Sequence, residues 1–372
     1  MAMGKYKVCV YAICKNEEKF VEEWMASMQE ADQVVVTDTG SQDDTVKRLK
    51  ELGAVVYTES IEPFRFDVAR NISLSHVPED VDICVCTDLD ERLEKGWREK
   101  LEAAWEEGIC QGKYLYNCSV GQDSKPFVQF IHFKVHTRKD FTWVYPCHEV
   151  LKYTGQSAYK EVFIDGFVLN HYPQEKKSRG SYLELLKLAV KEQPEDPRMN
   201  YYLGREYIYQ EDWENAIKRL SAYLELKDAT WREERGDAMR YIAFAYSKQN
   251  KYRQAYQWYY RAIAEVSWMR DGYVEFAKFA FQMGDFKTTY YMATEAIKIK
   301  TKSKVYINHG DAWDSTPYDL AGIGAFYIGL YEESYQYIKE AVSISPKDQR
   351  LLSNLQLVKG TLDAIREKRK TI

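Results

Sequence analysis

The stretch that decides the fold of this chain reads Ile83-Cys84-Val85-Cys86-Thr87-Asp88-Leu89-Asp90-Glu91. Its small and β-branched apolar residues, bounded by polar ones, predict a buried strand. In an open α/β sheet, ligands bind beyond the carboxyl ends of the strands, so we expect Asp88 and Asp90 at such a crevice. Residues two apart on an extended chain point the same way, so these carboxylates would repel unless a cation joins them. The alternative is that Asp88 caps a turn and Asp90 starts a helix.

The sequence on either side of this stretch alternates between strand and helix patterns. The expected strands cover residues 7–14, 33–37, 54–57 and 83–90, and the expected helices cover 17–29, 45–52 and 67–75. This alternation predicts right-handed parallel β-α-β units with helices on both faces of the sheet. The strand ends place residues 12–16, Asp38, Asp88 and Asp90 along one rim, where we expect a nucleotide. Neither a P-loop nor a dinucleotide-binding fingerprint is present.

Four motifs in this half of the chain carry a family resemblance. They are Ile13-Cys14-Lys15-Asn16-Glu17-Glu18, Asp38-Thr39-Gly40-Ser41-Gln42-Asp43-Asp44-Thr45, Ala69-Arg70-Asn71 and Thr87-Asp88-Leu89-Asp90-Glu91. Together they resemble the family 2 glycosyltransferases of GT-A fold, over roughly residues 5–175. Within that family the chain is most similar to the lipopolysaccharide-core β-glucosyltransferases and the peptide S-glycosyltransferases of glycosylated bacteriocins.

The resemblance implies inverting transfer of a hexose from a nucleotide sugar, expected to be UDP-linked, with Mn²⁺ or Mg²⁺ neutralising the diphosphate. It implies that Asp38 binds the nucleobase, that Arg70 lies near the base or phosphates, and that Asp88 meets the ribose or a metal-bound water. Asp90 would ligate the metal directly, with Asp88 as a second metal-site carboxylate. Further nucleotide-sugar contacts are expected from Ala12, Lys15 and Asn16. From the residues alone, Asp38 could instead open a turn, and Arg70 could pair with a surface carboxylate.

The segment Pro146-Cys147-His148-Glu149 supplies the expected catalytic residues. In the branch that the chain resembles, a comparable segment lies on the acceptor side of the sugar, which makes Glu149 the candidate general base and His148 its rival. His148 could also be a structural hydrogen-bonding residue. Trp143 or Tyr145 could stack on the sugar, although Trp143 could equally belong to the core.

The first half ends in Leu169-Asn170-His171-Tyr172-Pro173. A late histidine often completes the metal site in GT-A enzymes, so the resemblance makes His171 a candidate ligand, and an imidazole would suit Mn²⁺ better than Mg²⁺. A single histidine near an apolar strand could instead be structural. Pro173 stands where many relatives have glycine.

From Ser181 onward the pattern is helical and repeats at a spacing close to the 34 residues of tetratricopeptide repeats. Four sets of residues recur at fixed offsets. Small residues expected between paired helices align at Gly204, Ala243, Ala277 and Gly322, and aromatic residues follow nine positions later at Trp213, Tyr252, Phe286 and Tyr331. Three positions after these stand Ala216, Ala255, Thr289 and Ser334, and seven positions further stand Tyr223, Ala262, Ala296 and Ala341. Four helix pairs and a final helix over 348–369 are therefore expected. We predict a GT-A domain over 1–175 and a repeat domain over 176–372, the latter binding an acceptor peptide or forming a homodimer, or serving only as a rigid scaffold.

Charge and composition narrow the remaining possibilities. Residues 1–175 contain 20 Lys and Arg against 30 Asp and Glu, and residues 176–372 contain 32 against 27. An acidic catalytic half argues against nucleic-acid binding, because that needs a concentrated basic face. Seven cysteines without a C-x-x-C pair, no signal-like segment and no long apolar run predict a cytoplasmic protein with reduced thiols and no transmembrane helix.

The expected reaction moves a hexose to a peptide, a protein or a saccharide. Two alternatives stay open at this point. One is a scaffold in which the repeats bind a partner and the α/β half has lost its chemistry. The other is a nucleotidyltransferase, which usually needs a basic, glycine-rich loop after the first strand, where this chain offers only Lys15.

Overall fold

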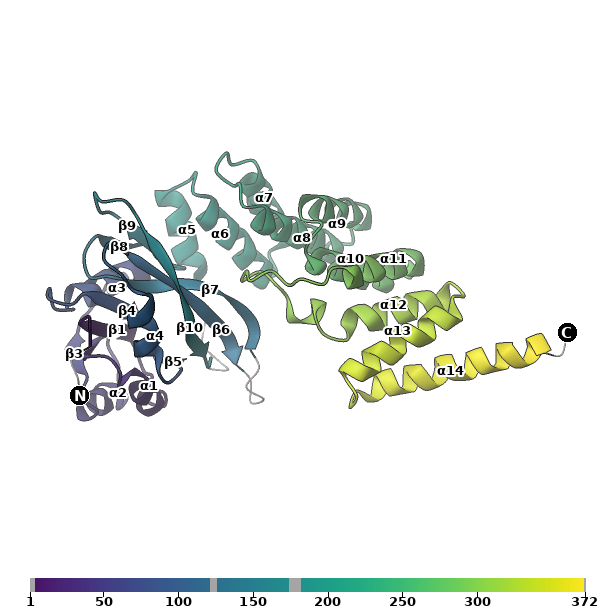
Figure 1. Ribbon diagram of the computed structural model, residues 1–372. Helices are drawn as coiled ribbons and strands as arrows, with labels where there is room; N and C mark the ends of the chain where they lie inside the picture. Colours follow the sequence, from purple (N-terminus) through teal and green to yellow (C-terminus); the bar gives the residue numbers. More distant parts are fainter. Residues whose placement is uncertain (1–3, 121–125, 174–181, 371–372) are drawn as a thin grey trace. The chain divides into compact units, whose positions relative to one another are not determined.

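The computed structural model of this chain describes residues 4–120, 126–173 and 182–370. The chain divides into two compact units, residues 1–192 and 193–372 (Figure 1). The domain boundary expected between residues 175 and 176 lies outside the described residues. The helix α5 (Tyr182–Glu192) belongs to the first unit.

The first unit is built on a mixed sheet whose described strands lie in the order β3-β2-β1-β4-β7-β6-β10-β5. Their bounds are β1 Val8–Cys14, β2 Gln33–Asp38, β3 Val55–Thr58, β4 Ile83–Cys86, β5 Glu91–Leu93, β6 Gln111–Val120, β7 Pro126–Thr137 and β10 Glu161–His171. Neighbours from β3 through β4 are parallel, as are β6 and β10. The strands β8 (Phe141–Val144) and β9 (Val150–Tyr153) form a separate antiparallel pair. The mostly parallel α/β architecture is therefore confirmed.

The core of this unit surrounds β1, in which every residue is buried. A strand buried on both faces reads as a continuous apolar run, as this one does, because helices cover both sides of the sheet. The helices connecting the strands are α1 (Val21–Met28), α2 (Thr45–Glu51), α3 (Phe66–Ser75) and α4 (Trp97–Ala104). Trp24 and Trp97 are fully buried in one apolar cluster with side chains of β1 and β4. These elements match the expected strands and helices to within a few residues at each end.

The expected strand over residues 83–90 is too long. The strand β4 ends at Cys86, and the chain then turns, with the Glu91 N–H donating to the Asp88 carbonyl at 3.0 Å. Thr87 is fully buried, and its hydroxyl accepts a hydrogen bond from the Trp24 indole at 3.1 Å. Because the chain is not extended here, the argument that Asp88 and Asp90 face the same way does not hold.

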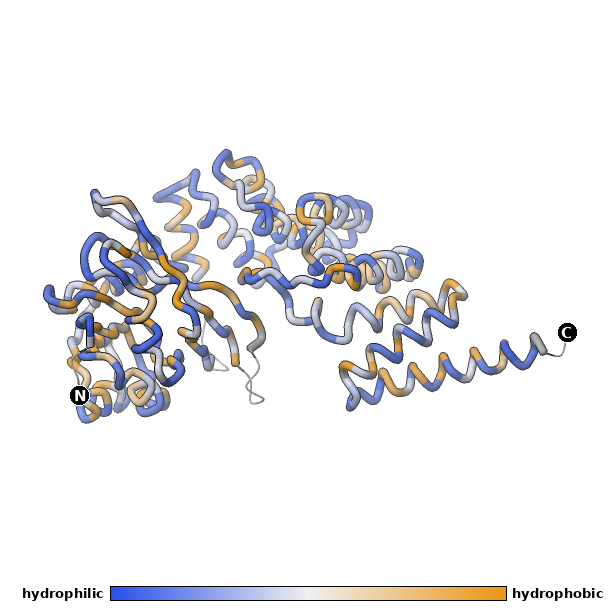
Figure 2. Tube along the Cα trace, in the orientation of Figure 1, coloured by the Kyte–Doolittle hydropathy of each residue, from blue (hydrophilic) through white to orange (hydrophobic). Residues whose placement is uncertain are grey.

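The second unit consists of paired helices. Their bounds are α6 Pro197–Tyr209, α7 Trp213–Leu224, α8 Arg232–Lys248, α9 Tyr252–Glu265, α10 Arg270–Gln282, α11 Phe286–Lys298, α12 Thr316–Tyr327, α13 Tyr331–Ile344 and α14 Gln349–Lys370. Along these helices apolar residues alternate with polar ones (Figure 2). Such a pattern buries one face of each helix against its neighbours. The pairs α6/α7, α8/α9, α10/α11 and α12/α13, followed by α14, confirm the expected repeat architecture.

The aligned small residues lie where paired helices approach closely. The four aligned aromatic residues begin α7, α9, α11 and α13. A methyl group added at Gly204 would lie 2.5 Å from Leu220 side-chain atoms, and one at Gly322 would lie 2.5 Å from Ile338. Ala243 and Ala277 are fully buried. The repeat spacing in the sequence therefore reflects helix contacts in which a larger side chain would not fit.

Two expectations about the chain as a whole can be compared with the structure. All seven cysteines are free, and six of them are buried. Among the described residues, no helix combines the length and apolar character needed to cross a lipid bilayer.

Candidate active site

The candidate site lies at the carboxyl ends of β1, β2 and β4. The strand β1 lies between β2 and β4, so the chain leaves β1 on one side for β2 and β3 and returns on the other side for β4. Ligands of open α/β sheets bind at such a switch in strand order. Lys15 and Asn16 follow β1, Asp38 ends β2, and Asp88 follows β4. The expected rim is therefore formed.

Asp38 shapes the loop after β2, and Asn16 joins that loop to the one after β1. The buried Asp38 carboxylate accepts hydrogen bonds from the backbone N–H groups of Gly40 and Ser41, both at 3.1 Å. Asn16 has a left-handed backbone, with φ 55°, and its side-chain oxygen accepts from the Gln42 N–H at 2.7 Å. The Asp38 contacts are the ones expected if Asp38 opens a turn. The Asn16 contact holds the loop at the end of β2 beside the loop after β1.

Lys15 and Ala12 were also expected to contact the nucleotide, and they differ in exposure to solvent. Lys15 is exposed at the rim. Ala12 is fully buried within β1, and its carbonyl accepts a hydrogen bond from the Ser73 hydroxyl at 2.9 Å. Because Ala12 lies two residues before the end of the strand, its methyl group belongs to the core and not to the exposed rim.

Arg70 is the centre of the site. Its guanidinium, 3% exposed, pairs with Asp88, and its Nε lies 3.1 Å from Glu149 Oε1. It also lies 5.5 Å from the Trp143 ring centroid. Burial opposes a charged guanidinium, but Asp88, Cys86 and Glu149 keep the pKa of Arg70 well above its usual value. A buried cation between two carboxylates is therefore the structural link between two segments 61 residues apart in sequence, Asp88 and Glu149.

Local contacts bring the Glu149 segment to Arg70. The Phe66 N–H, at the start of α3, donates to the Pro146 carbonyl at 2.9 Å. One turn later, the Asn71 side chain both donates to the Trp143 carbonyl and accepts from the Trp143 N–H, each at 2.8 Å. Helix α3 therefore carries Arg70 and also binds the chain at two points shortly before Glu149, at Trp143 and at Pro146.

Trp143 belongs to the core and is 3% exposed. Its indole N–H donates to the Tyr11 hydroxyl at 2.9 Å, and that hydroxyl lies 2.8 Å from His136 Nε2. Stacking of Trp143 on a sugar is therefore excluded by its burial. The neighbouring Tyr145 is partly exposed and has a left-handed backbone, with φ 79°.

Lys134 supplies a second cation that the sequence did not reveal. Its Nζ lies 3.3 Å from Asp88 Oδ2 and 3.6 Å from Glu91 Oε1. Glu91 is 2% exposed and accepts hydrogen bonds from the Tyr116 hydroxyl and the Asp88 N–H, both at 2.9 Å. Burial lowers the pKa of Lys134, but the two carboxylates outweigh it and raise that pKa above its usual range. Asp88 therefore lies between the buried Arg70 guanidinium and the largely buried Lys134 ammonium group.

The signal for Lys134 was present but ambiguous. Residues 128–136 mix aromatic, apolar and polar side chains, which predicts a strand but does not say which face is buried. The antiparallel pairing of β7 with β4 decides this, because it places β7 beside the acidic stretch. The sequence shows only a lysine between apolar residues of an expected strand, and it does not show that this lysine meets Asp88.

Asp90 forms the second pair of the site with His171. The Tyr172 N–H donates to the Asp90 carbonyl at 2.7 Å, and His171 is the register partner of Glu91 between β10 and β5. This pairing brings His171 Nε2 to 3.5 Å from Asp90 Oδ2, while Nδ1 lies 3.9 Å from Cys118 Sγ. Burial lowers the pKa of His171, but its hydrogen bond with Asp90 prevails and raises that pKa to about 10.

The Asp90–His171 pair fits a divalent cation. A carboxylate oxygen and an imidazole nitrogen 3.5 Å apart can bind the same ion, and this donor set suits Mn²⁺. Asp88 is directed to Arg70 and Lys134 instead. Within the described ranges, no three or more His, Cys, Asp or Glu side chains converge on a common point. The chain therefore offers two metal ligands here, and the others would come from water or substrate.

The two candidate bases have different surroundings. Glu149 has a side chain 12% exposed and belongs to the Arg70 cluster. His148 has a left-handed backbone, with φ 51°, and its ring centroid lies 5.6 Å from that of Tyr182 in α5. Of the two, Glu149 is the one that the structure joins to Asp88 through a shared partner.

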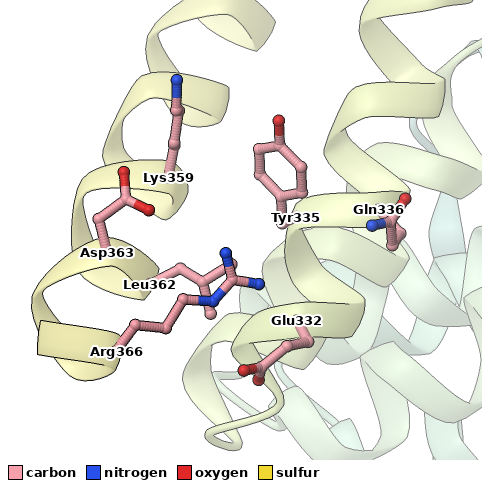
Figure 3. Close-up of a pocket in the computed structure, with 7 residues that line it drawn as sticks. All are labelled: Glu332, Tyr335, Gln336, Lys359, Leu362, Asp363 and Arg366. Carbon is pink, nitrogen blue, oxygen red and sulfur yellow. The ribbon is translucent and has the colours of Figure 1, made fainter. Parts of the chain in front are cut away.

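A separate depression lies between α13 and α14 in the repeat unit (Figure 3). Its lining residues are Glu332, Tyr335, Gln336, Lys359, Leu362, Asp363 and Arg366. None of them belongs to the rim of the sheet, so this depression is unrelated to the site described above.

A comparison with protein families identifies the chemistry of the first unit. Residues 9–163 match the family described as Glycosyl transferase family 2. This segment is a glycosyltransferase domain, and the chain is a glycosyltransferase. This match favours glycosyl transfer over the two alternatives for this unit, nucleotidyl transfer and a purely structural role.

Several solved structures resemble part of the chain. The crystal structure of MamA matches with 20% identity and a TM-score of 0.37, covering 45% of this chain and 89% of MamA. YrrB, described as a TPR protein with an unusual peptide-binding site, matches with 13% identity and a TM-score of 0.40, covering 49% and 85%. TTC0263, a thermophilic TPR protein of Thermus thermophilus, matches with 16% identity and a TM-score of 0.33, covering 47% and 88%. The repeat architecture itself rests on the helix pairs described above.

Proposed function

We propose that this enzyme transfers a hexose, with inversion, from a UDP-linked donor to a peptide, protein or saccharide acceptor in a metal-dependent reaction. The observation that carries the proposal is the charge arrangement at the sheet rim, where Arg70 links Asp88 to Glu149 and Asp90 faces His171. A site for a sugar diphosphate needs fixed charges at the leaving group and a base on the acceptor side. The resemblance to peptide and saccharide glycosyltransferases supports the choice of acceptor.

The reaction needs one bond to form as another breaks. The acceptor oxygen or sulfur attacks the anomeric carbon from the face opposite the diphosphate, the bond from that carbon to the diphosphate oxygen breaks, and the acceptor proton passes to a base. We assign Glu149 as that base, because its partly buried carboxylate is oriented by the Arg70 Nε at 3.1 Å. His148 stays the alternative, since its ring lies in the same loop.

The remaining rim residues bind and orient the donor. Asp88, fixed by Arg70 and Lys134, is assigned to the ribose, with the Asp38 and Asn16 loops beside it for the nucleobase. Asp90 and His171 would hold Mn²⁺ or Mg²⁺, which neutralises the negative charge of the departing diphosphate. Binding of the ion requires loss of the proton that the Asp90 carboxylate stabilises on His171.

The test is release of nucleoside diphosphate from a panel of nucleotide sugars in the presence of Mn²⁺. We expect the wild-type chain to turn over one donor, and Asp90→Asn to lose about a hundredfold or more of that rate. Asp165→Asn serves as the matched control, because Asp165 is exposed on β10, the same strand that ends at His171. Equal rates in Asp90→Asn and Asp165→Asn would refute the assignment of the site.

The repeat unit is assigned to acceptor engagement. Self-association through the repeats stays a prediction that sedimentation measurements on the whole chain would decide, with a dimer expected and a concentration-independent monomer as the contrary result.

A further inference from the structure

The histidine of the candidate metal pair is in contact with the strand beside its own. His171 ends β10, and its ring nitrogen Nε2 lies 3.5 Å from Asp90 Oδ2. The neighbouring strand β6 runs parallel to β10, and Asn117 of β6 lies opposite Asn170 of β10. The next residues along, Cys118 and His171, are therefore neighbours across the two strands.

Two side chains of β6 meet the His171 ring. Residues two apart on a strand point to the same face, so Tyr116 and Cys118 share one face of β6. The Tyr116 ring stacks on the His171 ring, with centroids 6.1 Å apart and an interplanar angle of 25°. The Tyr116 hydroxyl donates to the buried Glu91, which is the register partner of His171 in β5. One face of the imidazole is therefore held by a tyrosine that is itself anchored.

Cys118 contacts the edge of the same ring. Its sulfur lies 3.9 Å from Nδ1 of His171, whereas Nε2 of that ring faces Asp90. Cys118 also packs against the main apolar cluster of the first unit, which limits the movement of its side chain. The two nitrogens of the ring thus have different partners, a sulfur on one side and a carboxylate on the other.

The side on which the ring carries its hydrogen follows from these partners. A histidine binds a cation through a nitrogen without a hydrogen, and its other nitrogen then carries the hydrogen. Because Nε2 of His171 faces Asp90, the hydrogen belongs on Nδ1, where the Cys118 sulfur accepts it. Loss of such a partner usually lowers metal affinity by about 10–100-fold. Sulfur is a weak acceptor, so we expect an effect at the lower end of that range.

We propose that Cys118 is a positioning residue for the metal site, because its sulfur accepts the Nδ1–H of His171 and keeps the Nε2 lone pair directed towards Asp90. Cys118 acts on the ion through His171 and does not itself ligate it. This role rests on the metal site of the proposed function. It makes the affinity for the ion depend on β6, a strand that contains none of the four sequence motifs.

Cys118 is also the cysteine that a reagent reaches most easily. Six of the seven cysteines are buried, whereas Cys118 is partly exposed. Methyl methanethiosulfonate should therefore modify this thiol first in the folded chain. The thiol proton passes to solvent, the thiolate attacks the sulfenyl sulfur, a new S–S bond to a methylthio group forms, and methanesulfinate leaves. The added group should separate the sulfur from the His171 ring.

The experiment measures binding of Mn²⁺ alone to the whole chain by calorimetry, with no nucleotide sugar. We expect Cys118→Val, which keeps a similar volume but removes the acceptor, to bind Mn²⁺ about tenfold more weakly than wild type. Cys118→Ser keeps an acceptor and should recover most of this loss. Cys110→Val is the matched control and should bind like wild type, because the buried Cys110 precedes the opposite end of β6, where its sulfur lies 3.7 Å from the Gly108 carbonyl.

Two further measurements separate positioning from a general effect on the fold. Adding Cys118→Val to His171→Asn should weaken Mn²⁺ binding no further, because the group that Cys118 positions is already absent. Methyl methanethiosulfonate should lower the affinity of the wild-type chain about tenfold, and dithiothreitol should restore it. The same treatment should leave Cys118→Ser unchanged. Recovery on reduction would show that the loss does not come from unfolding.

The outcomes distinguish this role from the metal site on which it rests. Equal Mn²⁺ affinity of wild type and Cys118→Val, or an additive loss in the double variant with His171→Asn, would overturn the role of Cys118 and leave the metal site in place. A wild-type chain that binds no Mn²⁺ would refute the metal site itself and the role of Cys118 with it.

Discussion

Lys134 Nζ lies 3.3 Å from the Asp88 carboxylate, across two antiparallel strands of the sheet. The same ammonium group lies 3.6 Å from the buried Glu91. Lys134 therefore fixes the position of the Asp88 carboxylate together with Arg70, although it belongs to none of the sequence motifs. We treat it as a positioning residue, and this role leads to the first prediction.

Lys134→Met keeps most of the side-chain volume but removes the charge. Breaking a buried ion pair leaves its partner uncompensated, so we expect a loss of about 3 kcal/mol in the free energy of unfolding. Turnover of the donor should fall about tenfold or more as Asp88 shifts. Urea unfolding and diphosphate release measure the two effects. Adding Glu91→Gln should restore part of the stability, and Lys152→Met, at an exposed position on β9, should change neither quantity.

Arg70→Lys tests the need for a forked cation. A lysine is a point charge and cannot hold Asp88 and Glu149 at the same time in the way that a guanidinium does. We expect turnover to fall by about two orders of magnitude, with a smaller loss of stability than in Arg70→Met, which leaves both carboxylates without their cation. Thermal unfolding of the two variants, beside their rates, checks this. Full activity of Arg70→Lys would mean that only the charge matters.

Acid should destabilise the first unit through His136. Burial lowers the pKa of this histidine to about 4, whereas its ordinary value is 6.5. Its Nδ1 lies 2.8 Å from the Thr137 carbonyl, so Nδ1 carries the proton and Nε2 accepts from the Tyr11 hydroxyl.

Between these two pKa values the unfolded chain binds more protons than the folded chain, so the free energy of unfolding decreases as the pH falls from about 6.5 towards 4, by about 3 kcal/mol in total. Urea unfolding of wild type and His136→Gln across this range measures the contribution. The variant should be less stable at neutral pH but should lose less stability on acidification. Parallel pH profiles for the two proteins would contradict the assignment.

Metal binding should release a proton. With the pKa of His171 raised to about 10 by Asp90, the imidazole is charged at neutral pH and must become neutral to bind a cation. Calorimetric titration of Mn²⁺ in buffers of different ionisation enthalpy should therefore report release of about one proton per site. The variant His171→Asn should bind more weakly and release none. Identical proton release in both proteins would exclude His171 as a ligand.

Two glycines of the repeat unit should respond in opposite ways to the same substitution. A methyl group at Gly204 would lie 2.5 Å from Leu220 side-chain atoms, so Gly204→Ala should destabilise the unit by about 1–3 kcal/mol. At Gly360, in α14, no atom lies within 4 Å of the added methyl group, so Gly360→Ala should stabilise by up to about 1 kcal/mol. Urea unfolding followed by circular dichroism distinguishes the two. Equal effects would mean that the close helix contact at Gly204 does not limit side-chain size.

The repeats could be predicted well from the sequence because their contacts are local. Gly204 and Leu220 are 16 residues apart, and the same offset recurs at Gly322 and Ile338. A periodic pattern therefore reports the packing directly. The path of residues 299–315 could not be predicted, because it depends on contacts such as the hydrogen bond of the Tyr306 hydroxyl with Glu234 of α8, which no repeat encodes.

The candidate site was only partly predictable for the same reason. Asp88, Asp90 and Arg70 lie in motifs, but their partners lie far away in sequence, as with His171 opposite Asp90. The expectation that Asp88 and Asp90 share one direction was wrong, because β4 ends at Cys86 and the chain turns between Asp88 and Glu91. Strand pairing, which a single sequence does not reveal, decided which residues meet.

The claim that the rim of the first sheet binds the donor can be tested most directly by calorimetric titration of UDP, with and without Mn²⁺. We predict that the wild-type chain binds UDP more tightly when Mn²⁺ is present, that Asp90→Asn loses this metal dependence, and that Asp165→Asn keeps it. Binding of UDP that is unchanged by Mn²⁺ and by Asp90→Asn would contradict the account.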